Sequence, residues 1–221
     1  MLIGGQAVNY WAERYLAVEP ELRRRLPFTS EDIDFKGNRD DVRHIAEQLK
    51  LTPVYPHPVE MTALAGAIPF RIGNLKSNIE VVRSIPGVAT GAVDGLAIRA
   101  GWGGKQIRVL DPISLLLCKL ELALKLPQEK RQDVVHLKIL VVCARGFIRE
   151  LLREVERGSI PAKGWLGAVN RLLRMAGSSH GRKAAKKYEI NWNEILPLTE
   201  IIRCRHEKIA RFYEKQLSHE K

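Results

Sequence analysis

The sequence predicts an α/β (α+β) protein in which a small mixed-sheet domain, residues 1–111, precedes an α-helical domain, residues 112–221. Short runs typical of strands are concentrated in the first part, whereas almost every segment of the second part has helical character. Asp111 and Pro112 fit the N-cap and the first position of a helix, so this dipeptide marks the boundary between the two parts.

The first part should contain two helices and a set of short strands. We expect helices over residues 6–17 and 40–49, with a loop or a further helix across residues 19–27. Strands are predicted for the run around Asp32 and Asp34 and for residues 67–72, 78–85, 95–100 and 105–110. A Gly-Trp-Gly-Gly turn joins the last two strands into a hairpin.

The helices of the second part should be separated by breaks that contain proline, glycine or small polar residues. We expect these breaks near Pro127, across residues 158–164, at the polar stretch of residues 177–183 and at Pro197.

The composition places the chain among globular proteins without a membrane partner. No apolar run approaches the ~20 residues of a membrane-spanning helix. The N-terminus lacks a basic segment followed by an apolar stretch, so no secretory signal is expected and the cytoplasm is the expected location. Three cysteines, Cys118, Cys143 and Cys204, form no CxxC pair, which suits a reducing compartment.

The charge is strongly positive and unevenly distributed. The net charge of +11 favours polyanionic partners or substrates. Residues 145–221 hold 17 Lys and Arg against 9 Glu and no Asp, an excess of eight positive charges. We therefore expect nucleic-acid contacts in this last third.

Asp32 and Asp34 stand one residue apart in a short apolar stretch. In a strand these carboxylates project side by side from one face, while Ile33 and Phe35 pack on the other. Like charges this close repel one another, and a divalent cation such as Mg²⁺ would relieve the repulsion. The alternative is a solvated strand end or a helix N-cap.

Glu80 is a third carboxylate within a strand-like run, where it alternates with Ile79 and Val81. If this strand neighbours the Asp32/Asp34 strand, the three acids converge, and they could hold one or two Mg²⁺ ions that bridge nucleotide phosphates. The alternative is an acid on the solvent side of an edge strand.

Lys119 lies near the middle of the apolar arc of the helix that follows Pro112. A buried ammonium requires a carboxylate or a bound phosphate as its partner, unless the long side chain reaches water. Asp133 lies within the apolar stripe of the next helix. A buried Lys119–Asp133 ion pair therefore competes with a nucleotide-binding role for both residues.

Several motifs follow the order found in one enzyme family: a glycine pair, a Ser-x-Asp-x-Asp strand, a later acid, a helical lysine and an aspartate on the next helix. Here these are Gly4-Gly5, Ser30-x-Asp32-Ile33-Asp34, Glu80, Lys119 and Asp133. The order resembles the nucleotidyltransferase superfamily typified by DNA polymerase beta, and is closest to its AbiEii/AbiGii-type toxin branch. The likeness covers about the first 140 residues. The chain departs from the pattern in having Glu80 where an Asp is usual and His136 at the end of the Asp133 motif.

The resemblance implies that residues 1–111 form a nucleotidyltransferase-like domain. The implied activity is Mg²⁺-dependent transfer of a nucleoside monophosphate from an NTP to a hydroxyl of RNA, such as tRNA, or of a protein. Such an enzyme can be the toxin partner of an antitoxin protein. The family pattern implies triphosphate binding by Gly4, Gly5 and Ser30, metal binding by Asp32 and Asp34, and nucleotide contact by Lys119. To these we add Glu80 as a third metal-binding acid that assists deprotonation of the attacking hydroxyl, and Asp133 as a nucleotide-site residue.

A different class of function also fits the sequence: a noncatalytic nucleic-acid-binding protein on a degenerate transferase scaffold. Arg149, Arg153 and Arg157 recur at helical spacing and form a basic ridge, and residues 182–187, RKAAKK, form a basic cluster in or beside a loop. For the ridge, the alternative is a solvated helix face, because Glu150, Glu154 and Glu156 are interspersed with the arginines.

Overall fold

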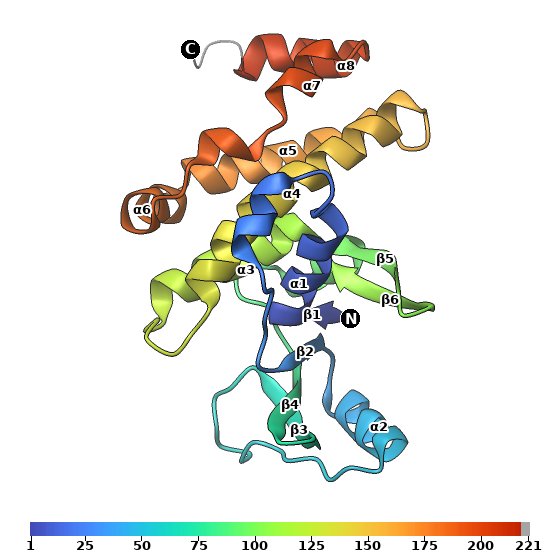
Figure 1. The fold of residues 1–221 in the computed structure, drawn as a ribbon, viewed down its shortest axis with the longest axis vertical. Coiled ribbons are helices and arrows are strands. Elements are labelled where there is room, and N and C mark those ends of the chain that lie inside the picture. The colour runs from blue at the N-terminus through green and yellow to red at the C-terminus, as the bar shows by residue number, and fades with distance from the viewer. Residues whose placement is uncertain (218–221) are drawn as a thin grey trace.

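The computed structural model describes residues 1–217 and contains one mixed six-stranded sheet followed by a helical region, which confirms the α/β class (Figure 1). The sheet order is β3-β4-β2-β1-β6-β5. Its strands are β1 (Leu2–Ile3), β2 (Ile33–Lys36), β3 (Leu64–Ile72), β4 (Leu75–Val82), β5 (Ala97–Trp102) and β6 (Lys105–Leu110).

Two antiparallel hairpins, β3–β4 and β5–β6, form the two ends of the sheet. Between them, β2 runs parallel to β4 and antiparallel to β1, and β1 runs parallel to β6. The predicted Gly-Trp-Gly-Gly turn is present, and Gly103 and Gly104 both have positive φ angles of 55° and 75°. Glycine adopts such angles without steric cost, which explains its use in this tight hairpin.

The helices surround the sheet and extend beyond it. Those of the first part are α1 (Gly4–Tyr15), the 3₁₀ helices η1 (Pro20–Arg25) and η2 (Thr90–Leu96), and α2 (Arg39–Leu49). The helical region consists of α3 (Pro112–Lys125), α4 (Asp133–Glu156), α5 (Ala162–Gly177), α6 (Ser179–Tyr188), η3 (Trp192–Ile195), α7 (Leu198–Arg203), α8 (Glu207–Phe212) and the π-helical turn η4 (Tyr213–Leu217). Within residues 1–217, no helix combines the length and apolar character needed to cross a membrane.

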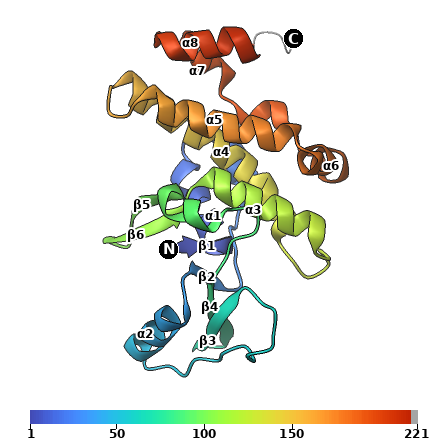
Figure 2. The same cartoon turned by 180° about the vertical axis from the view of Figure 1, so that it is seen from behind.

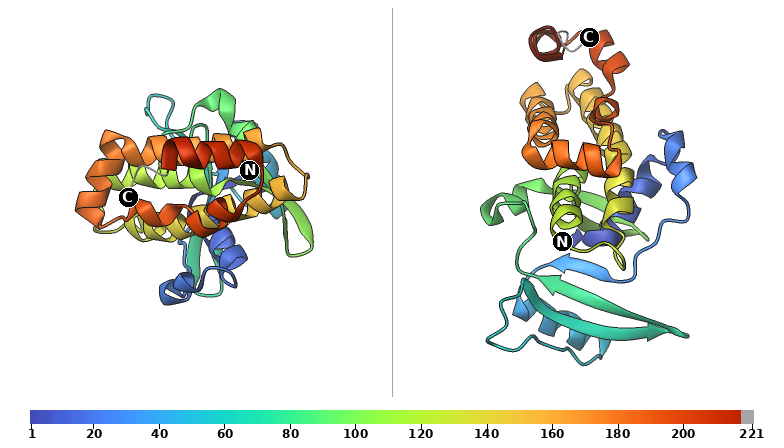
Figure 3. Two further views of the ribbon diagram at one scale, coloured as in Figure 1. Left: turned by 90° about the horizontal axis from the view of Figure 1, so that it is seen from above. Right: turned by 90° about the vertical axis from the view of Figure 1, so that its left-hand side faces the viewer.

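The molecule is elongated, with the β3–β4 hairpin and α2 at one end and α7 and α8 at the other (Figures 2 and 3). The main core joins α1, α3, α4 and α5 to the β1–β6 part of the sheet and includes buried side chains on both sides of residue 111. A smaller core lies between α2 and the β3–β4 hairpin. Ile33 and Phe35 on β2 pack against both cores, so their side chains connect the two ends of the sheet.

Several predicted elements need correction. The predicted strand of residues 78–85 is found three residues earlier, as Leu75–Val82, and the first helix begins at Gly4 rather than at residue 6. The polar stretch 177–183 is a break at one residue only, because Ser178 caps α6 by accepting a hydrogen bond from the Gly181 N–H at 2.9 Å. The basic run 182–187 therefore lies on a helix and not in or beside a loop.

Candidate active site

The three candidate carboxylates meet where β2 and β4 run side by side. The parallel register places Asp34 opposite Glu80, and Asp32 directly precedes β2. All three acids are half-buried and line one cleft of about 270 Å³. The condition under which the three acids converge, that the Glu80 strand neighbours the strand of Asp34, therefore holds in the structure.

The Gly4-Gly5 pair lies beside the three acids because β1, which pairs with β2, ends directly before α1. Gly4 has a φ of +63°, and a Cβ on it would lie 1.8 Å from the Asp34 Oδ2. A Cβ on Gly5 would lie 2.2 Å from the Ser30 hydroxyl oxygen. Both distances are far shorter than real contacts allow, so residues without a side chain are required where α1 begins.

Hydrogen bonds fix the aspartates in the cleft. The Asn78 backbone N–H and side-chain amide donate to Asp32 Oδ1 at 3.1 and 3.2 Å. The Ser30 hydroxyl donates to the Asp32 carbonyl at 2.9 Å. Asp34 accepts from the Gly5 backbone N–H at the start of α1, and Ile3, the N-cap residue of this helix, has no side chain that can cap it. The open N-terminus of α1 therefore faces the acids directly.

The protein environment favours protonation of two of these acids. Burial raises the pKa of Asp34 above its usual range, and the charge of Asp32 adds to the effect, while Lys119 and the Gly5 N–H oppose it. Burial also raises the pKa of Glu80, with further contributions from Asp34 and Asp32. This is the expected result when carboxylates are crowded together in a partly dry cleft.

The opposite side of the cleft carries positive charge. Lys119 on α3 donates to Asp133 Oδ1 at 2.8 Å, and the Arg131 Nε lies 2.6 Å from Asp133 Oδ2. The side chains of Lys119 and Asp133 are 9% and 2% exposed, so the buried ion pair expected from the sequence is present. Although burial alone would raise the pKa of Asp133, Lys119 and Arg131 hold it below its usual range.

Lys119 nevertheless also belongs to the cleft. It lines the same volume as Asp34, and its charge is the main influence that lowers the Asp34 pKa. The structural and nucleotide-contact roles considered from the sequence are therefore compatible, because Lys119 pairs with Asp133 and lines the cleft at the same time. The complete lining consists of Gly5, Ser30, Glu31, Asp32, Asp34, Glu80, Lys119, Lys130, Arg131, Gln132, Asp133 and His136. Gly4 borders it through Asp34.

His136 is a cleft residue to which the sequence analysis gave no role. Its Nε2 lies 3.3 Å from the Thr29 carbonyl oxygen, which can only accept, so Nε2 carries the proton in this hydrogen bond. Nδ1 is then an acceptor, and it is buried without a partner. Burial and the nearby Lys119 lower the His136 pKa to about 4, so the ring is neutral near pH 7. The sequence shows that His136 follows Asp133 by three residues, but it does not show that the His136 side chain is buried in the cleft.

The donor set fits a magnesium ion that is only partly coordinated by protein. Among residues 1–217, no three His, Cys, Asp or Glu side chains lie close enough together to hold a metal ion by themselves. Mg²⁺, however, is commonly bound by one or two carboxylates, with waters and substrate phosphates completing its coordination. Asp32 and Asp34 on one face of a strand fit that requirement.

The two groups of basic residues considered for nucleic-acid binding differ in their exposure to solvent. Arg149 is 16% exposed and pairs with Glu19 and, at 2.6 Å, with Glu200. It is therefore unavailable to a phosphate, and the predicted Arg149-Arg153-Arg157 ridge is wrong as a continuous binding surface. Arg182, Lys183, Lys186 and Lys187 are all exposed on α6 and form a cationic helix face.

Comparisons with known proteins identify no relative. No protein-family model matches the sequence, and a search of curated proteins finds no significant match. Arguments about function therefore depend on the residues and their geometry.

The buried ion pair predicts a specific pattern of stability changes. Lys119→Met should lower the free energy of unfolding by about 2–4 kcal/mol, because it leaves Asp133 buried with only Arg131 as its partner. Asp133→Asn in the same chain should restore part of this loss. Urea unfolding measures both changes. Lys125→Met on the same helix, where the lysine is 64% exposed, is the matched control. A wild-type unfolding curve for Lys119→Met would contradict the pair's structural role.

The neutral His136 predicts a loss of stability in weak acid. In the unfolded chain a histidine binds its proton near pH 6.5, whereas folded His136 resists protonation down to about pH 4. The unfolded state therefore binds more protons in this window, and stability falls as the pH falls. From pH 6.5 to 5.0 the wild type should lose about 1.5 kcal/mol relative to His136→Gln. Urea titrations at both pH values test this, with the exposed His44→Gln as control. Equal losses in wild type and His136→Gln would refute it.

Proposed function

We propose that the protein is a Mg²⁺-dependent nucleotidyltransferase that transfers a nucleoside monophosphate from an NTP to a hydroxyl of RNA or protein. The observation that carries the proposal is the pairing of Asp34 with Glu80 across β2 and β4, directly beside the uncapped, glycine-rich start of α1. Acids for a metal ion and backbone N–H groups for phosphates thus lie in one cleft, as this reaction requires.

Phosphate binding is assigned to the start of α1 and to the positive side of the cleft. The first backbone N–H groups of a helix attract anions, and the start of α1 borders the cleft through Gly5. Ser30 lies beside Gly5 and offers a hydroxyl. Lys130 and Arg131 line the cleft and are exposed to solvent. Their side chains can therefore reach a triphosphate in the cleft without first breaking buried contacts. Lys119 supplies positive charge from α3.

The carboxylates divide into two roles. Asp32 and Asp34 would hold Mg²⁺, which, when bound, neutralises the phosphate charge that develops during transfer. Glu80 has a raised pKa and lies opposite Asp34, so it is the acid best suited to accept the proton of the attacking hydroxyl. His136 presents an unpartnered acceptor nitrogen in the same cleft and would orient a hydroxyl or amino group of the nucleotide.

The acceptor is proposed to be RNA, such as tRNA, with a protein hydroxyl as the alternative acceptor. The exposed cations of α6 support RNA, because they provide the charged surface on which a phosphate backbone can be held. A toxin role with an antitoxin partner follows only from the family resemblance and belongs to the same proposal.

A noncatalytic nucleic-acid-binding function is the second candidate. It is favoured by the cationic α6 and by the absence, within residues 1–217, of a ready-made centre of three metal-binding side chains. The two candidates differ in one measurable property: an enzyme should bind NTPs more tightly when Mg²⁺ is present, whereas a nucleic-acid-binding scaffold should not.

Transfer activity and its dependence on Asp34 test the main proposal. Incubation with labelled NTPs, Mg²⁺ and total RNA should transfer label to RNA or to protein. Asp34→Asn should abolish both the transfer and Mg²⁺-dependent NTP binding while leaving apo stability unchanged or slightly higher, because it removes a half-buried like charge. Asp94→Asn, an exposed acid outside the cleft, is the control. If Asp34→Asn binds MgATP and MgCTP as wild type does, the metal assignment is wrong.

The proposed RNA surface predicts a change in salt dependence. Replacing Arg182, Lys183, Lys186 and Lys187 with Gln should weaken RNA binding and flatten the log–log salt slope by roughly 0.7 for each phosphate of single-stranded RNA that the variant no longer neutralises. Filter binding at several salt concentrations measures the slope. A control removes four other exposed cations of the last third, Arg203, Arg205, Lys208 and Arg211. Equal slopes for the two variants would show that only net charge matters.

A further inference from the structure

A second cavity, of about 410 Å³, lies on the other side of α3 from Lys119 and has no lining residue in common with the cleft. Its volume falls within the range of small-molecule sites. It is enclosed by α3, by α5 and the start of α6, and by the segment of residues 87–96 that leads through η2 toward β5. The proposed transferase chemistry uses none of its residues.

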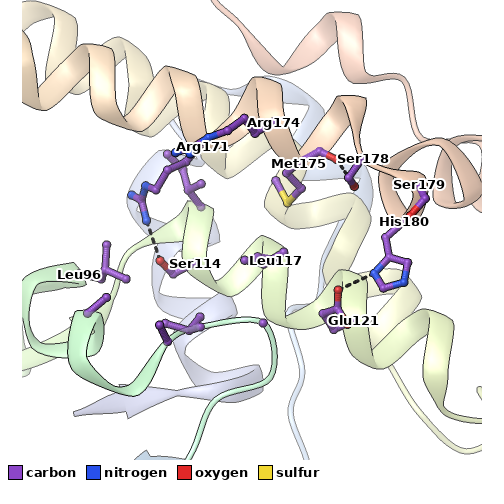
Figure 4. Close-up of a pocket in the computed structure, with 15 residues that line it drawn as sticks. Leu96, Ser114, Leu117, Glu121, Arg171, Arg174, Met175, Ser178, Ser179 and His180 are labelled. Carbon is purple, nitrogen blue, oxygen red and sulfur yellow. Dashed lines mark hydrogen bonds and ion pairs between the residues drawn. The ribbon is translucent and has the colours of Figure 1, made fainter.

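The middle of this cavity is apolar. Figure 4 shows Met175 reaching down from α5 toward α3, on which Leu117 lies, so the two side chains bound the space from opposite sides. Val88, Leu96 and Ile113 complete the apolar part of the lining. An apolar molecule between these side chains would be removed from water, which is the main source of favourable binding free energy in such sites.

Polar groups are confined to the two ends. At one end, Arg171 donates to Ser114 Oγ at 2.9 Å (Figure 4). Arg171 also pairs with Asp111 at 3.1 Å. At the other end, His180 Nδ1 lies 2.6 Å from Glu121, which also pairs with Lys125. The charges of Arg171 and Glu121 are therefore already compensated within the protein.

Arg174 is the exception among the charged lining residues. Its Nε donates to the Asn170 carbonyl at 3.3 Å, and none of the acids in residues 1–217 forms an ion pair with it. Arg174 is exposed at the edge of the cavity, so its uncompensated guanidinium is free to donate charge-assisted hydrogen bonds to an anion there.

We propose that this cavity binds a small apolar carboxylic acid, whose body lies between Leu117 and Met175 and whose carboxylate is held by Arg174. The guanidinium can form two parallel hydrogen bonds to a carboxylate, which a neutral or cationic head group cannot accept. The site is separate from the cleft, so acid binding does not compete with a nucleotide.

Matched eight-carbon probes test the head-group preference. Octanoate, octan-1-ol and octylammonium are titrated into the full chain by calorimetry. Octanoate should bind about tenfold more tightly than octan-1-ol, the difference expected for one charge-assisted contact, and octylammonium should bind most weakly. Equal affinities for octanoate and octan-1-ol, or no octanoate binding at millimolar concentration, would overturn the proposal.

Variants test the location. Arg174→Gln should weaken octanoate binding about tenfold and leave octan-1-ol unchanged, whereas Arg153→Gln, an exposed arginine on α4, should change neither. Ala92→Phe, at an exposed lining position, should block both ligands, and Ala89→Phe replaces it if its thermal melt is abnormal. Octanoate binding that survives Arg174→Gln unchanged, survives a folded blocking variant, or is displaced by MgATP would overturn the assignment.

Discussion

The contact between the Asp34 carboxylate and the start of α1 is the constraint on which the rest of the site depends. A side chain at Gly4 would occupy the position of Asp34 Oδ2, so the two segments approach as closely as atoms allow. The contact is possible because β1, only two residues long, pairs with β2 through Ile3 and Asp34 and then turns directly into α1. The same arrangement places an uncapped helix N-terminus beside three acids. The Gly5 N–H and the Asp34 carboxylate each satisfy the other in this contact.

The buried Lys119–Asp133 pair connects this cleft to the helical region. α3 and α4 pack along one another in the main core, and their only buried charges that meet across the interface within residues 1–217 are Lys119 and Asp133. Burying an ion pair stabilises little by itself, since the loss of solvation offsets most of the attraction. Stability alone therefore gives little reason for the Lys119–Asp133 pair at the edge of the cleft. A second role for the Lys119 ammonium, contact with a ligand in the cleft as the proposed function requires, would give one.

The sequence predicted the elements better than their arrangement. The alternation predicted correctly that Asp34 and Glu80 lie on strands, although Asp32 falls just before β2 and the Glu80 strand begins three residues earlier than expected, and the Asp111-Pro112 start of α3 was correct. Sequence could not show that β2 and β4 are neighbours, because β3 lies between them in the chain but not in the sheet. It also failed at α6, where Gly-Ser-Ser-His-Gly has weak helix propensity. There, tertiary contacts prevail: Ala184 is fully buried, and the Tyr188 hydroxyl donates to the Ala123 carbonyl at 2.5 Å.

The charge of the chain as a whole differs from the charge within the cleft. Residues 145–221 carry an excess of eight positive charges out of a net +11, which leaves only three for the first 144 residues. Within the cleft, the β2–β4 side is acidic, whereas Lys119, Lys130 and Arg131 supply cations on the other side. A magnesium–triphosphate complex has the same division, with the ion on one side and phosphate oxygens on the other. A cleft with one sign of charge would attract only half of that complex, whereas two opposed sides would orient it, as the proposed transfer requires.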